Sequence, residues 1–358
     1  MVFDVPAENG GALSILSEFY DEVKNYEDKT VHWIFVLSKP TFKETENIKI
    51  IRYPWVKKSW LHRFYFDQVV ASKLVKRFNV DKIFSLQNII VPRINVEQIL
   101  YVHQPLPFIK HQFSFKENRL FWVYQKVISK TIYTSIKKAK KVIVQTNWLK
   151  KSCADRTGVN EKKITVVSPS IDIKIDEGFI LNKDSSNTFF YPASGLIYKN
   201  HKVIIEACKL LKNEGIDTFK VIFTLKGNEN KHISMCYEEV QKYGLPVEFV
   251  GNMKREDVFK FYKKSVLVFP SYIETFGLPL LEAKLHGSPI IASDSAFSIE
   301  ILHDYSNAYF FDSSNLRQLG ELMKQMIENK LPYSESNYII EIPGVGQNSL
   351  INQIIDNI

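Results

Sequence analysis

VLVFPSYIETFGLPLLEAKLHGSPIIASD, residues 266–294, contains two short apolar runs on either side of a segment with a helical pattern. A buried strand, a helix and a second buried strand form a βαβ unit, whose strands pair in parallel in a sheet covered by helices. Gly277 allows close backbone approach, and Pro279 suits the first turn of a helix. The stretch therefore predicts a loop and a helix at the carboxyl edge of a parallel sheet, where α/β folds bind ligands.

The same alternation of strand and helix patterns runs along most of the chain and restarts once. The predicted strands are residues 1–5, 31–38, 81–86, 97–104, 140–146, 163–172, 187–194, 219–227, 247–252, 266–271 and 288–294. The predicted helices are residues 12–25, 66–79, 117–139, 200–215, 255–265, 278–287 and 314–329. The pattern predicts two Rossmann-like, doubly wound α/β domains that face a cleft.

The domain boundaries follow from where the alternation stops. We predict a first domain over residues 1–170, a polar linker without a period over 171–187, and a second domain over 188–344. A weak helical pattern over residues 345–358 predicts a last helix that returns to the first domain.

Composition restricts the class of protein. No apolar run approaches the roughly 20 residues of a membrane-spanning helix, and the first residues lack a signal-peptide pattern. Three cysteines without CxxC spacing argue against a disulfide framework or a zinc site. We therefore expect a soluble, cytoplasmic protein.

Charge is divided unevenly between the two halves. Residues 1–170 contain 28 lysines and arginines against 15 aspartates and glutamates, whereas the rest contains 19 against 24. A basic half favours an anionic partner, which could be nucleic acid, an anionic membrane leaflet or a pyrophosphate-linked substrate. Solvated surface lysines explain the same count.

The two carboxylates around the Gly-Leu-Pro turn suggest the chemistry of the loop. Glu274 opens it, and we place Glu282 in the first turn of the helix. The free N–H groups of Gly277 and Leu278 would favour a phosphate, and the carboxylates would accept hydrogen bonds from sugar hydroxyls on either side of it. A nucleotide-sugar has this layout. The alternative is an ordinary helix N-terminus with a dipole-favoured glutamate.

Residues 270–294 closely resemble the E-x7-E signature of retaining GT-B glycosyltransferases, the group called glycosyltransferase family 4. The resemblance covers most of the chain and is most specific here. It implies that Glu274 contacts the donor sugar near the reaction centre and that Glu282 binds the ribose. The family positions that line the sugar and the pyrophosphate correspond to Ser271, Thr275, Phe276, Gly277 and Leu278.

Two further segments resemble the family's donor site. Residues 247–262 resemble the segment that flanks the nucleobase, which implies that Gly251, Asn252 and Met253 lie there. Residues 191–207 resemble the phosphate-binding segment. There Lys199 would meet the diphosphate and Asn200 would open the next helix.

One departure from the family concerns an arginine that most relatives carry shortly before this lysine. Ala193, Ser194 and Gly195 stand in its place. Either Lys199 acts alone or another base substitutes, with Lys226 the first candidate. The alternative for Lys199 is a solvated loop lysine.

In the first half, PAENGGALSIL resembles the family's Gly-Gly loop, where Gly11 would let the first helix approach the diphosphate. His103 follows a predicted strand, at a point where the family often has a histidine close to the donor sugar. Imidazole titration near neutral pH suits proton relay, although a structural histidine is the alternative.

The resemblance implies a retaining transfer of a sugar from a nucleotide-diphosphate-sugar, UDP- or GDP-linked, to a hydroxyl of a glycan or polyprenyl-pyrophosphate-linked acceptor, as in bacterial surface-polysaccharide synthesis. The chain has no Asp-x-Asp, so we expect no metal and no cofactor. We expect no nucleic-acid partner, because no binding motif is present. The basic, aromatic segments at residues 53–66 and 135–151 suit peripheral docking on the anionic inner face of a membrane.

Two other functions remain open. A non-catalytic GT-B partner that stabilises another transferase is compatible with the missing arginine. A nucleotide-sugar epimerase would share the fold but does not carry the E-x7-E segment.

Overall fold

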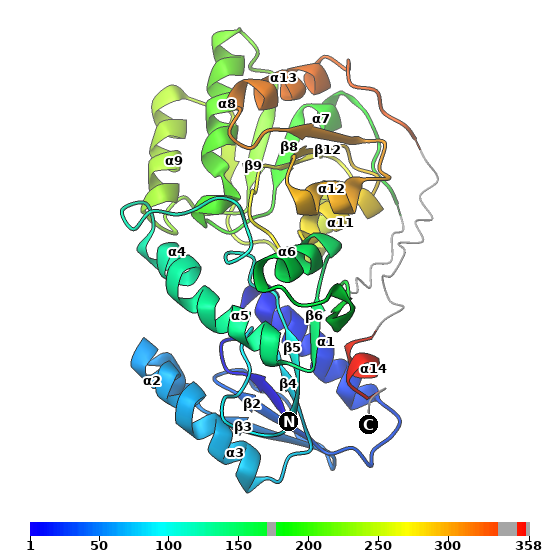
Figure 1. The fold of residues 1–358 in the computed structure, drawn as a ribbon. Helices are drawn as coiled ribbons and strands as arrows, with labels where there is room; N and C mark the ends of the chain where they lie inside the picture. Colours follow the sequence, from blue (N-terminus) through cyan, green and yellow to red (C-terminus); the bar gives the residue numbers. More distant parts are fainter. Residues whose placement is uncertain (170–176, 336–348, 356–358) are drawn as a thin grey trace. The chain divides into compact units, whose positions relative to one another are not determined.

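The computed structural model describes residues 1–169, 177–335 and 349–355 (Figure 1). The described chain forms two compact units, each built around one parallel sheet. Unit 1 comprises Met1–Ser170 together with Pro343–Ile358, and unit 2 comprises Ile171–Ile342. The predicted pair of Rossmann-like α/β domains is confirmed.

Unit 1 contains a seven-stranded sheet in the order β3-β2-β1-β4-β5-β6-β7, in which every pairing is parallel. Its strands are β1 (Val2–Asp4), β2 (Trp33–Leu37), β3 (Ile48–Arg52), β4 (Lys82–Ser85), β5 (Glu97–Tyr101), β6 (Lys141–Val144) and β7 (Ile164–Val166). The order reverses between β1 and β4, and in such folds the reversal marks a ligand-binding edge.

Helices surround this sheet, and two of them contain a π-helical segment. The helical elements are α1 (Gly10–Asn25), η1 (Pro54–Lys57), α2 (Trp60–Tyr65), η2 (Phe66–Val70), α3 (Ala71–Arg77), α4 (Arg119–Val123), η3 (Tyr124–Ile128), α5 (Ser129–Lys138), α6 (Asn147–Thr157), η4 (Glu161–Lys163) and α14 (Leu350–Ile355). The π-helical turns η2 and η3 join α2 to α3 and α4 to α5 into two long, continuous helices.

Helix α14 belongs to unit 1 and packs on α1, as blue and red ribbons show in Figure 1. Leu350, Ile351 and Ile354 are buried in the same core as Phe19 and Val23 of α1. The Glu22 carboxylate accepts hydrogen bonds from the backbone N–H of Ile351, at 2.8 Å, and of Leu350, at 3.3 Å. The first turn of α14 is therefore capped by α1.

Unit 2 contains a six-stranded parallel sheet in the order β10-β9-β8-β11-β12-β13. Its strands are β8 (Thr188–Tyr191), β9 (Lys220–Phe223), β10 (Val247–Phe249), β11 (Val266–Phe269), β12 (Ile290–Ser293) and β13 (Ala308–Phe311). Its helical elements are α7 (Lys183–Ser186), η5 (Ile197–Lys199), α8 (His201–Asn213), α9 (Lys231–Tyr243), α10 (Arg255–Tyr262), α11 (Leu278–Leu285), α12 (Ala296–Leu302) and α13 (Leu316–Ile327).

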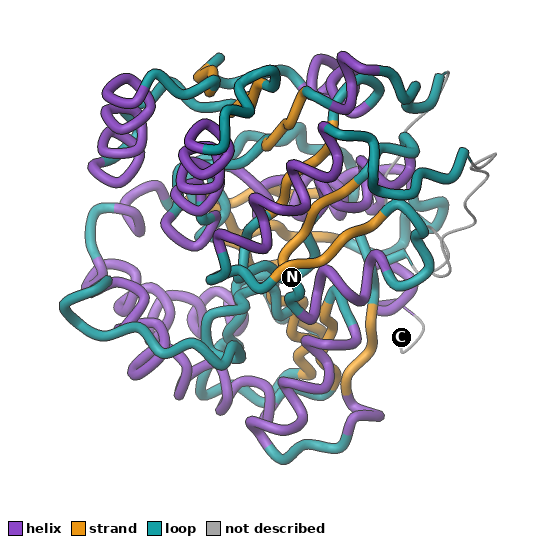
Figure 2. Tube along the Cα trace, turned by 90° about the horizontal axis from the view of Figure 1, so that it is seen from above, coloured by secondary structure: helices purple, strands orange, loops and turns teal. Residues whose placement is uncertain are grey.

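The interior strands are buried on both faces, as the apolar runs predict. Every residue of β8, β11 and β12 is buried. The alternation of strands and helices along the chain is visible in Figure 2, where strands are orange and helices purple.

Several elements differ from the sequence prediction. Strands β3 and β13 and helices α2, α6, α9 and α12 were not predicted as such. The stretch predicted as an aperiodic linker contains α7, which begins with a capping box between Asn182 and Ser185. Residues 170–172 of a predicted strand, and residues 345–348 and 356–358 of the predicted last helix, lie outside the described residues.

Candidate active site

The candidate site of unit 2 is built where the strand order reverses, between β8 and β11. Both strands end at the carboxyl edge, and the loops that follow them are tied together. The backbone N–H of Tyr272 donates to the Tyr198 carbonyl at 3.2 Å. The Ser271 hydroxyl donates to the same carbonyl at 3.3 Å. Two segments more than 70 residues apart thus form one rigid edge.

Lys199 and Glu274 meet at this edge. The Lys199 ammonium forms an ion pair with Glu274 Oε1, and the Ser271 hydroxyl donates to the same oxygen at 2.8 Å. Both charged side chains are largely shielded from solvent, with 15% and 16% of their surface exposed. The structure therefore brings three of the predicted site residues into direct contact.

The backbone around Lys199 is fixed by its neighbours. The Tyr191 hydroxyl, at the end of β8, donates to the Lys199 carbonyl at 2.8 Å. Asn200 adopts a left-handed conformation, with φ of 60°, immediately before α8. Its side-chain amide donates to the carbonyl of Ser313 at 2.8 Å. Asn200 opens the helix as predicted, and its side chain tethers two loops.

The loop from Glu274 reaches α11 through Gly277, which has a φ of +89°. An added Cβ there would lie 3.2 Å from Leu280 Cδ1, so both conformation and space favour glycine. No side chain of the described residues caps α11. Pro279 has no N–H and the Leu280 N–H donates to the Gly277 carbonyl at 2.9 Å, so the Leu278 N–H is left for an anion. Phe276 is buried beneath the loop, whereas Thr275 and Leu278 are half-buried.

Glu282 lies in the second turn of α11, not in the first as predicted, because the helix begins at Leu278. The side chain is buried and is held by two residues of α10. Arg255 Nη2 donates to Oε1 at 3.0 Å, and the Tyr262 hydroxyl donates to Oε2 at 3.1 Å. Burial raises the pKa of Glu282, and Arg255 and Tyr262 oppose that shift.

Arg255 and Tyr262 were missed from the sequence. They stand seven residues apart on α10, which places them two turns apart on the same face of the helix. This spacing was the signal in the sequence that could have shown that both side chains reach one site. The Arg255 side chain is 55% exposed, so a ligand hydroxyl could replace it at Glu282 without disturbing the core.

Gly251 follows β10 with a φ of +78°, and its N–H donates to the Leu225 carbonyl at 2.8 Å. An added Cβ at Gly251 would lie 3.5 Å from Lys226 Cγ. The exposed Lys226 thus lies at the carboxyl edge, close to one of the predicted nucleobase positions. Beside them, Asn252 is exposed and Met253 half-buried.

The segment that lacks the family arginine is packed against α9. An added Cβ at Gly195 would lie 2.7 Å from Ile233 Cγ1, and the Asn230 amide donates to the Gly195 carbonyl at 2.7 Å. Ala193 is buried, whereas Ser194 is exposed. A side chain at Gly195 would require residues at the start of α9 to move. This crowding is a steric reason why the family arginine is absent at this position.

Gly11 and His103 lie in unit 1. Gly11 is the second residue of α1, and an added Cβ there would have no described atom within 4 Å. His103 follows β5, and its backbone N–H donates to Asn88 Oδ1 at 2.7 Å, an oxygen that also accepts from the Gln104 N–H at 2.9 Å. Burial lowers the pKa of the His103 imidazole to about 4. A hydrogen bond with the Leu86 backbone acts in the opposite direction but is the smaller effect. A pKa lowered in this way does not match the expected titration near neutral pH, and the place of His103 beside the donor sugar stays a prediction.

Unit 1 contains a network of charged groups that the sequence did not reveal. Asp4 ends β1 and is buried, and burial raises its pKa to about 7. Arg63 Nε donates to Asp67 Oδ2 at 2.6 Å, and Arg63 Nη2 donates to Gln87 Oε1 at 3.1 Å. These residues gather near the ends of β1 and β4, where the strand order reverses.

Metal-binding clusters and membrane-spanning helices were also sought in the described ranges. No group of three or more histidine, cysteine, aspartate or glutamate side chains there could hold a metal ion. None of the helices in those ranges combines the length and the apolar character needed to cross a bilayer.

Comparison with known proteins links this geometry to a family. Residues 172–341 match the family described as "Glycosyl transferases group 1", which covers the Lys199–Glu274 pair and Glu282. Over 216 residues the chain is 26% identical to the O-antigen chain mannosyltransferase RfbU of Salmonella typhimurium, covering 58% of this chain and 59% of that protein.

A second relative is the N,N'-diacetylbacillosaminyl-diphospho-undecaprenol alpha-1,3-N-acetylgalactosaminyltransferase of Campylobacter jejuni. It is 26% identical over 188 residues, which are 48% of this chain and 47% of that protein. The chain therefore spans less than two thirds of the length of either relative.

Among solved structures, Anabaena Alr3699/HepE, in complex with UDP and glucose, matches with a TM-score of 0.64 at 15% identity, over 92% of this chain and 90% of that one. At this identity the likeness shows the fold alone. The two parallel-sheet units therefore have the GT-B fold.

Proposed function

We propose that this chain is a retaining glycosyltransferase that moves a sugar from a nucleoside diphosphate to a hydroxyl group of a glycan or lipid-linked acceptor in surface-polysaccharide synthesis. The observation that carries the proposal is the Lys199–Glu274 pair at the strand reversal of unit 2, inside the matched residues 172–341. The names of the two relatives, which refer to an O-antigen chain and a diphospho-undecaprenol acceptor, support the acceptor class.

The donor diphosphate is assigned to the space before α11. Lys199 supplies a positive charge there, and the uncapped first turn of α11 supplies the Leu278 N–H. Both interactions strengthen as the leaving diphosphate gains negative charge, which is the condition for accelerating the reaction. We propose that this charge is met without an essential metal ion.

Glu274 is assigned to the sugar. Its Oε1 is held by Lys199 and Ser271, so the carboxylate is fixed before a donor arrives. When Lys199 turns to the diphosphate, Glu274 becomes a less compensated negative charge beside the sugar. That charge favours an oxocarbenium-like transition state.

Glu282 is assigned to the ribose. Its two oxygens already accept from Arg255 and Tyr262, and the ribose hydroxyls would replace the exposed Arg255. Gly251, Asn252 and Met253 are assigned to the base, which we propose is uracil or guanine. Lys226, next to Gly251, would substitute for the missing arginine.

Calorimetric unfolding with UDP, GDP, ADP, dTDP and their sugars tests the donor site, with EDTA present throughout. A ligand at ~100 times its dissociation constant stabilises the folded state by about 2.7 kcal/mol. We expect one nucleotide class to stabilise the wild type but not Glu282→Gln. The matched control is Glu238→Gln, an exposed glutamate on α9 of the same unit, which should respond like the wild type.

Transfer is tested separately with the donor identified in this way. We expect the Glu274→Gln variant to bind the nucleotide but lose transfer, and NMR of the wild-type product to show a retained anomeric configuration. An inverted product would refute the retaining mechanism. Stabilisation by no nucleotide would refute the donor site and favour the non-catalytic partner, for which Gly195 and its missing arginine are the supporting observation.

A further inference from the structure

Unit 1 exposes a short helix whose large apolar side chains face away from the core. Helix α2 has no buried residue. Trp60, Leu61, Phe64 and Tyr65 have exposed fractions between 53% and 79%. Burial of such side chains is the main favourable term in folding, so a helix that exposes four of them has an apolar face available to a partner.

The neighbouring helix extends this face. Leu120 of α4 and Val127 of η3 are also about half exposed, and they lie two turns apart on one continuous helix. The ring centroids of Trp60 and Tyr124 are 6.3 Å apart, so α2 and the α4–η3 helix are in contact. We call the side chains of Trp60, Leu61, Phe64, Tyr65, Leu120 and Val127 the apolar face.

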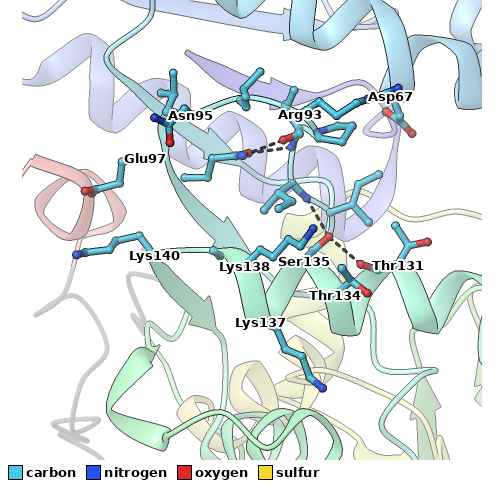
Figure 3. Close-up of a pocket in the computed structure, with 18 of the residues that line it drawn as sticks. Asp67, Arg93, Asn95, Glu97, Thr131, Thr134, Ser135, Lys137, Lys138 and Lys140 are labelled. Carbon is cyan, nitrogen blue, oxygen red and sulfur yellow. Dashed lines mark hydrogen bonds between the residues drawn. The ribbon is translucent and has the colours of Figure 1, made fainter.

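Basic side chains border the apolar face. Lys58 lies two residues before the start of α2, and Lys126 and Lys130 lie on the second helix beside Val127; all three are exposed. Between the two helices runs a cavity of about 1270 Å³, whose lining includes Asp67 and Gln68 from one helix and Lys130, Thr131 and Thr134 from the other (Figure 3).

The lining of this cavity is predominantly basic. Its cations are Arg93, Lys130, Lys137, Lys138, Lys140 and Lys163. Its acids are Asp67, which is paired with Arg63, and Glu97. Lys137, Lys138, Lys140 and Lys163 lie at the end of α5 and the starts of β6 and β7, so the positive charge that borders the apolar face itself comes from Lys58, Lys126 and Lys130.

An apolar face bordered by lysines favours some binding partners over others. Two copies of the chain meeting face to face would bring their lysines together, which is unfavourable. An anionic bilayer instead offers an apolar interior for the leucine and phenylalanine, a headgroup zone suited to tryptophan and tyrosine, and a negative potential for the lysines.

We propose that unit 1 docks on an anionic lipid bilayer through the apolar face, with the lysines around it contacting lipid headgroups. Helix α2 also carries Arg63, whose guanidinium contacts Gln87, just beyond the carboxyl end of β4. Docking therefore places the carboxyl edge of the unit 1 sheet near the headgroups. If the proposed function holds, on which this last step rests, a lipid-diphosphate acceptor reaches that edge from the bilayer.

Vesicle flotation tests the proposal with phosphatidylcholine vesicles, with and without phosphatidylglycerol. We expect binding only with phosphatidylglycerol. Leu61→Ser/Phe64→Ser should lower the partition coefficient ~30-fold, since each side chain loses part of its burial in the bilayer. The matched control is Met235→Ser/Ile299→Ser, which removes two exposed apolar side chains of unit 2 and should bind like the wild type.

The electrostatic part has its own variant. Lys126→Gln/Lys130→Gln should lower binding about five-fold for each lysine, as should added salt. The control Lys231→Gln/Lys242→Gln changes two lysines of α9 in unit 2 and should have little effect. A blue shift of Trp60 emission on vesicles, absent in Trp60→Phe, would place α2 itself in the bilayer.

Equal binding of wild type and Leu61→Ser/Phe64→Ser would overturn the proposal, as would binding that ignores phosphatidylglycerol. Sedimentation that shows a dimer of the wild type, lost in Leu61→Ser/Phe64→Ser, would assign the face to a second copy instead. Nucleotide binding is measured separately, without vesicles. Binding of nucleotide by a protein that does not bind vesicles would refute the docking proposal alone and leave the proposed function intact. The unfolding midpoint of each variant shows that it is folded.

Discussion

Asp4 provides the sharpest quantitative prediction, because its carboxyl group is buried at the end of β1 with one oxygen unpaired. Within the described residues, Asp4 Oδ1 has no hydrogen-bond partner. Burial is the main cause that raises its pKa from 3.8 to about 7, while Arg63, the Ala7 backbone and Lys57 act in the opposite direction. Folding therefore favours the protonated form.

The sign of the pH dependence follows from this shift. A carboxyl whose pKa is higher in the folded state contributes stability that is fully present below pH 3.8 and is lost as pH rises through 7. Asp4→Asn removes the titration and keeps a similar shape. At 1.36 kcal/mol per pH unit, the stability of the variant relative to the wild type should rise by about 2.5 kcal/mol between pH 5 and pH 8.

Denaturant unfolding followed by tryptophan emission measures this difference. All five tryptophans lie between residues 33 and 148, so the signal reports on unit 1. Asp217→Asn, at an exposed position of unit 2, is the control and should show no such trend. A stability difference that stays constant from pH 5 to pH 8 would refute the reasoning and indicate that Arg63 keeps Asp4 ionised in the fold.

Three further predictions concern the candidate site. Gly11→Ala should leave unit 1 as stable as the wild type or up to about 1 kcal/mol more stable, because Gly11 is helical and an added Cβ meets no described atom. The variant should nevertheless bind the donor more weakly, and unchanged binding in titration calorimetry would remove Gly11 from the site. Arg255→Ala should destabilise unit 2 by about 1 kcal/mol at pH 8, and by less towards pH 4, where Glu282 takes up a proton. Calorimetric unfolding measures this difference, and a loss of stability that does not change with pH would contradict the ion pair. Gly195→Arg should lower the calorimetric unfolding midpoint of unit 2, at a cost of roughly 2 kcal/mol. Ser194→Arg, at an exposed position, should fold normally and bind nucleotide more tightly. A Ser194→Arg variant less stable than Gly195→Arg would refute the steric argument.

The sequence predicted the elements that carry a strong apolar signal. Strands β8, β11 and β12 are buried throughout, so their runs of apolar residues stand out from the flanking turns. The loop before α11 was predicted because Gly277 and Pro279 have few other uses in such a place. Local residue chemistry was enough at these positions.

The missed elements lack that signal for identifiable reasons. Helix α2 buries none of its residues, so no amphipathic period marks it. Strand β3 is interrupted by the exposed Lys49, and β13 fully buries only Phe311 of its four residues. The π-helical turn η2 changes the helical period between α2 and α3, which a fixed period of 3.6 residues does not follow.

The pairing of site residues was also beyond the sequence. Lys199 and Glu274 were each predicted, but their ion pair depends on β8 lying beside β11, which local patterns do not specify. The same holds for Glu282 and its partners on α10. Contacts between distant segments come from sheet order, and sheet order is a property of the whole domain.

The Lys199–Glu274 pair bears directly on how a donor would bind. Each charge compensates the other in the free protein, so neither is left unpaired in a largely shielded position. A diphosphate that attracts Lys199 would therefore weaken one ion pair while forming another, and part of the binding energy would go into exposing the Glu274 charge to the sugar. On this argument Lys199→Met should impair transfer even where the nucleotide still binds, because Glu274 would lose the ion pair that fixes its carboxylate and would no longer present it to the sugar in one position.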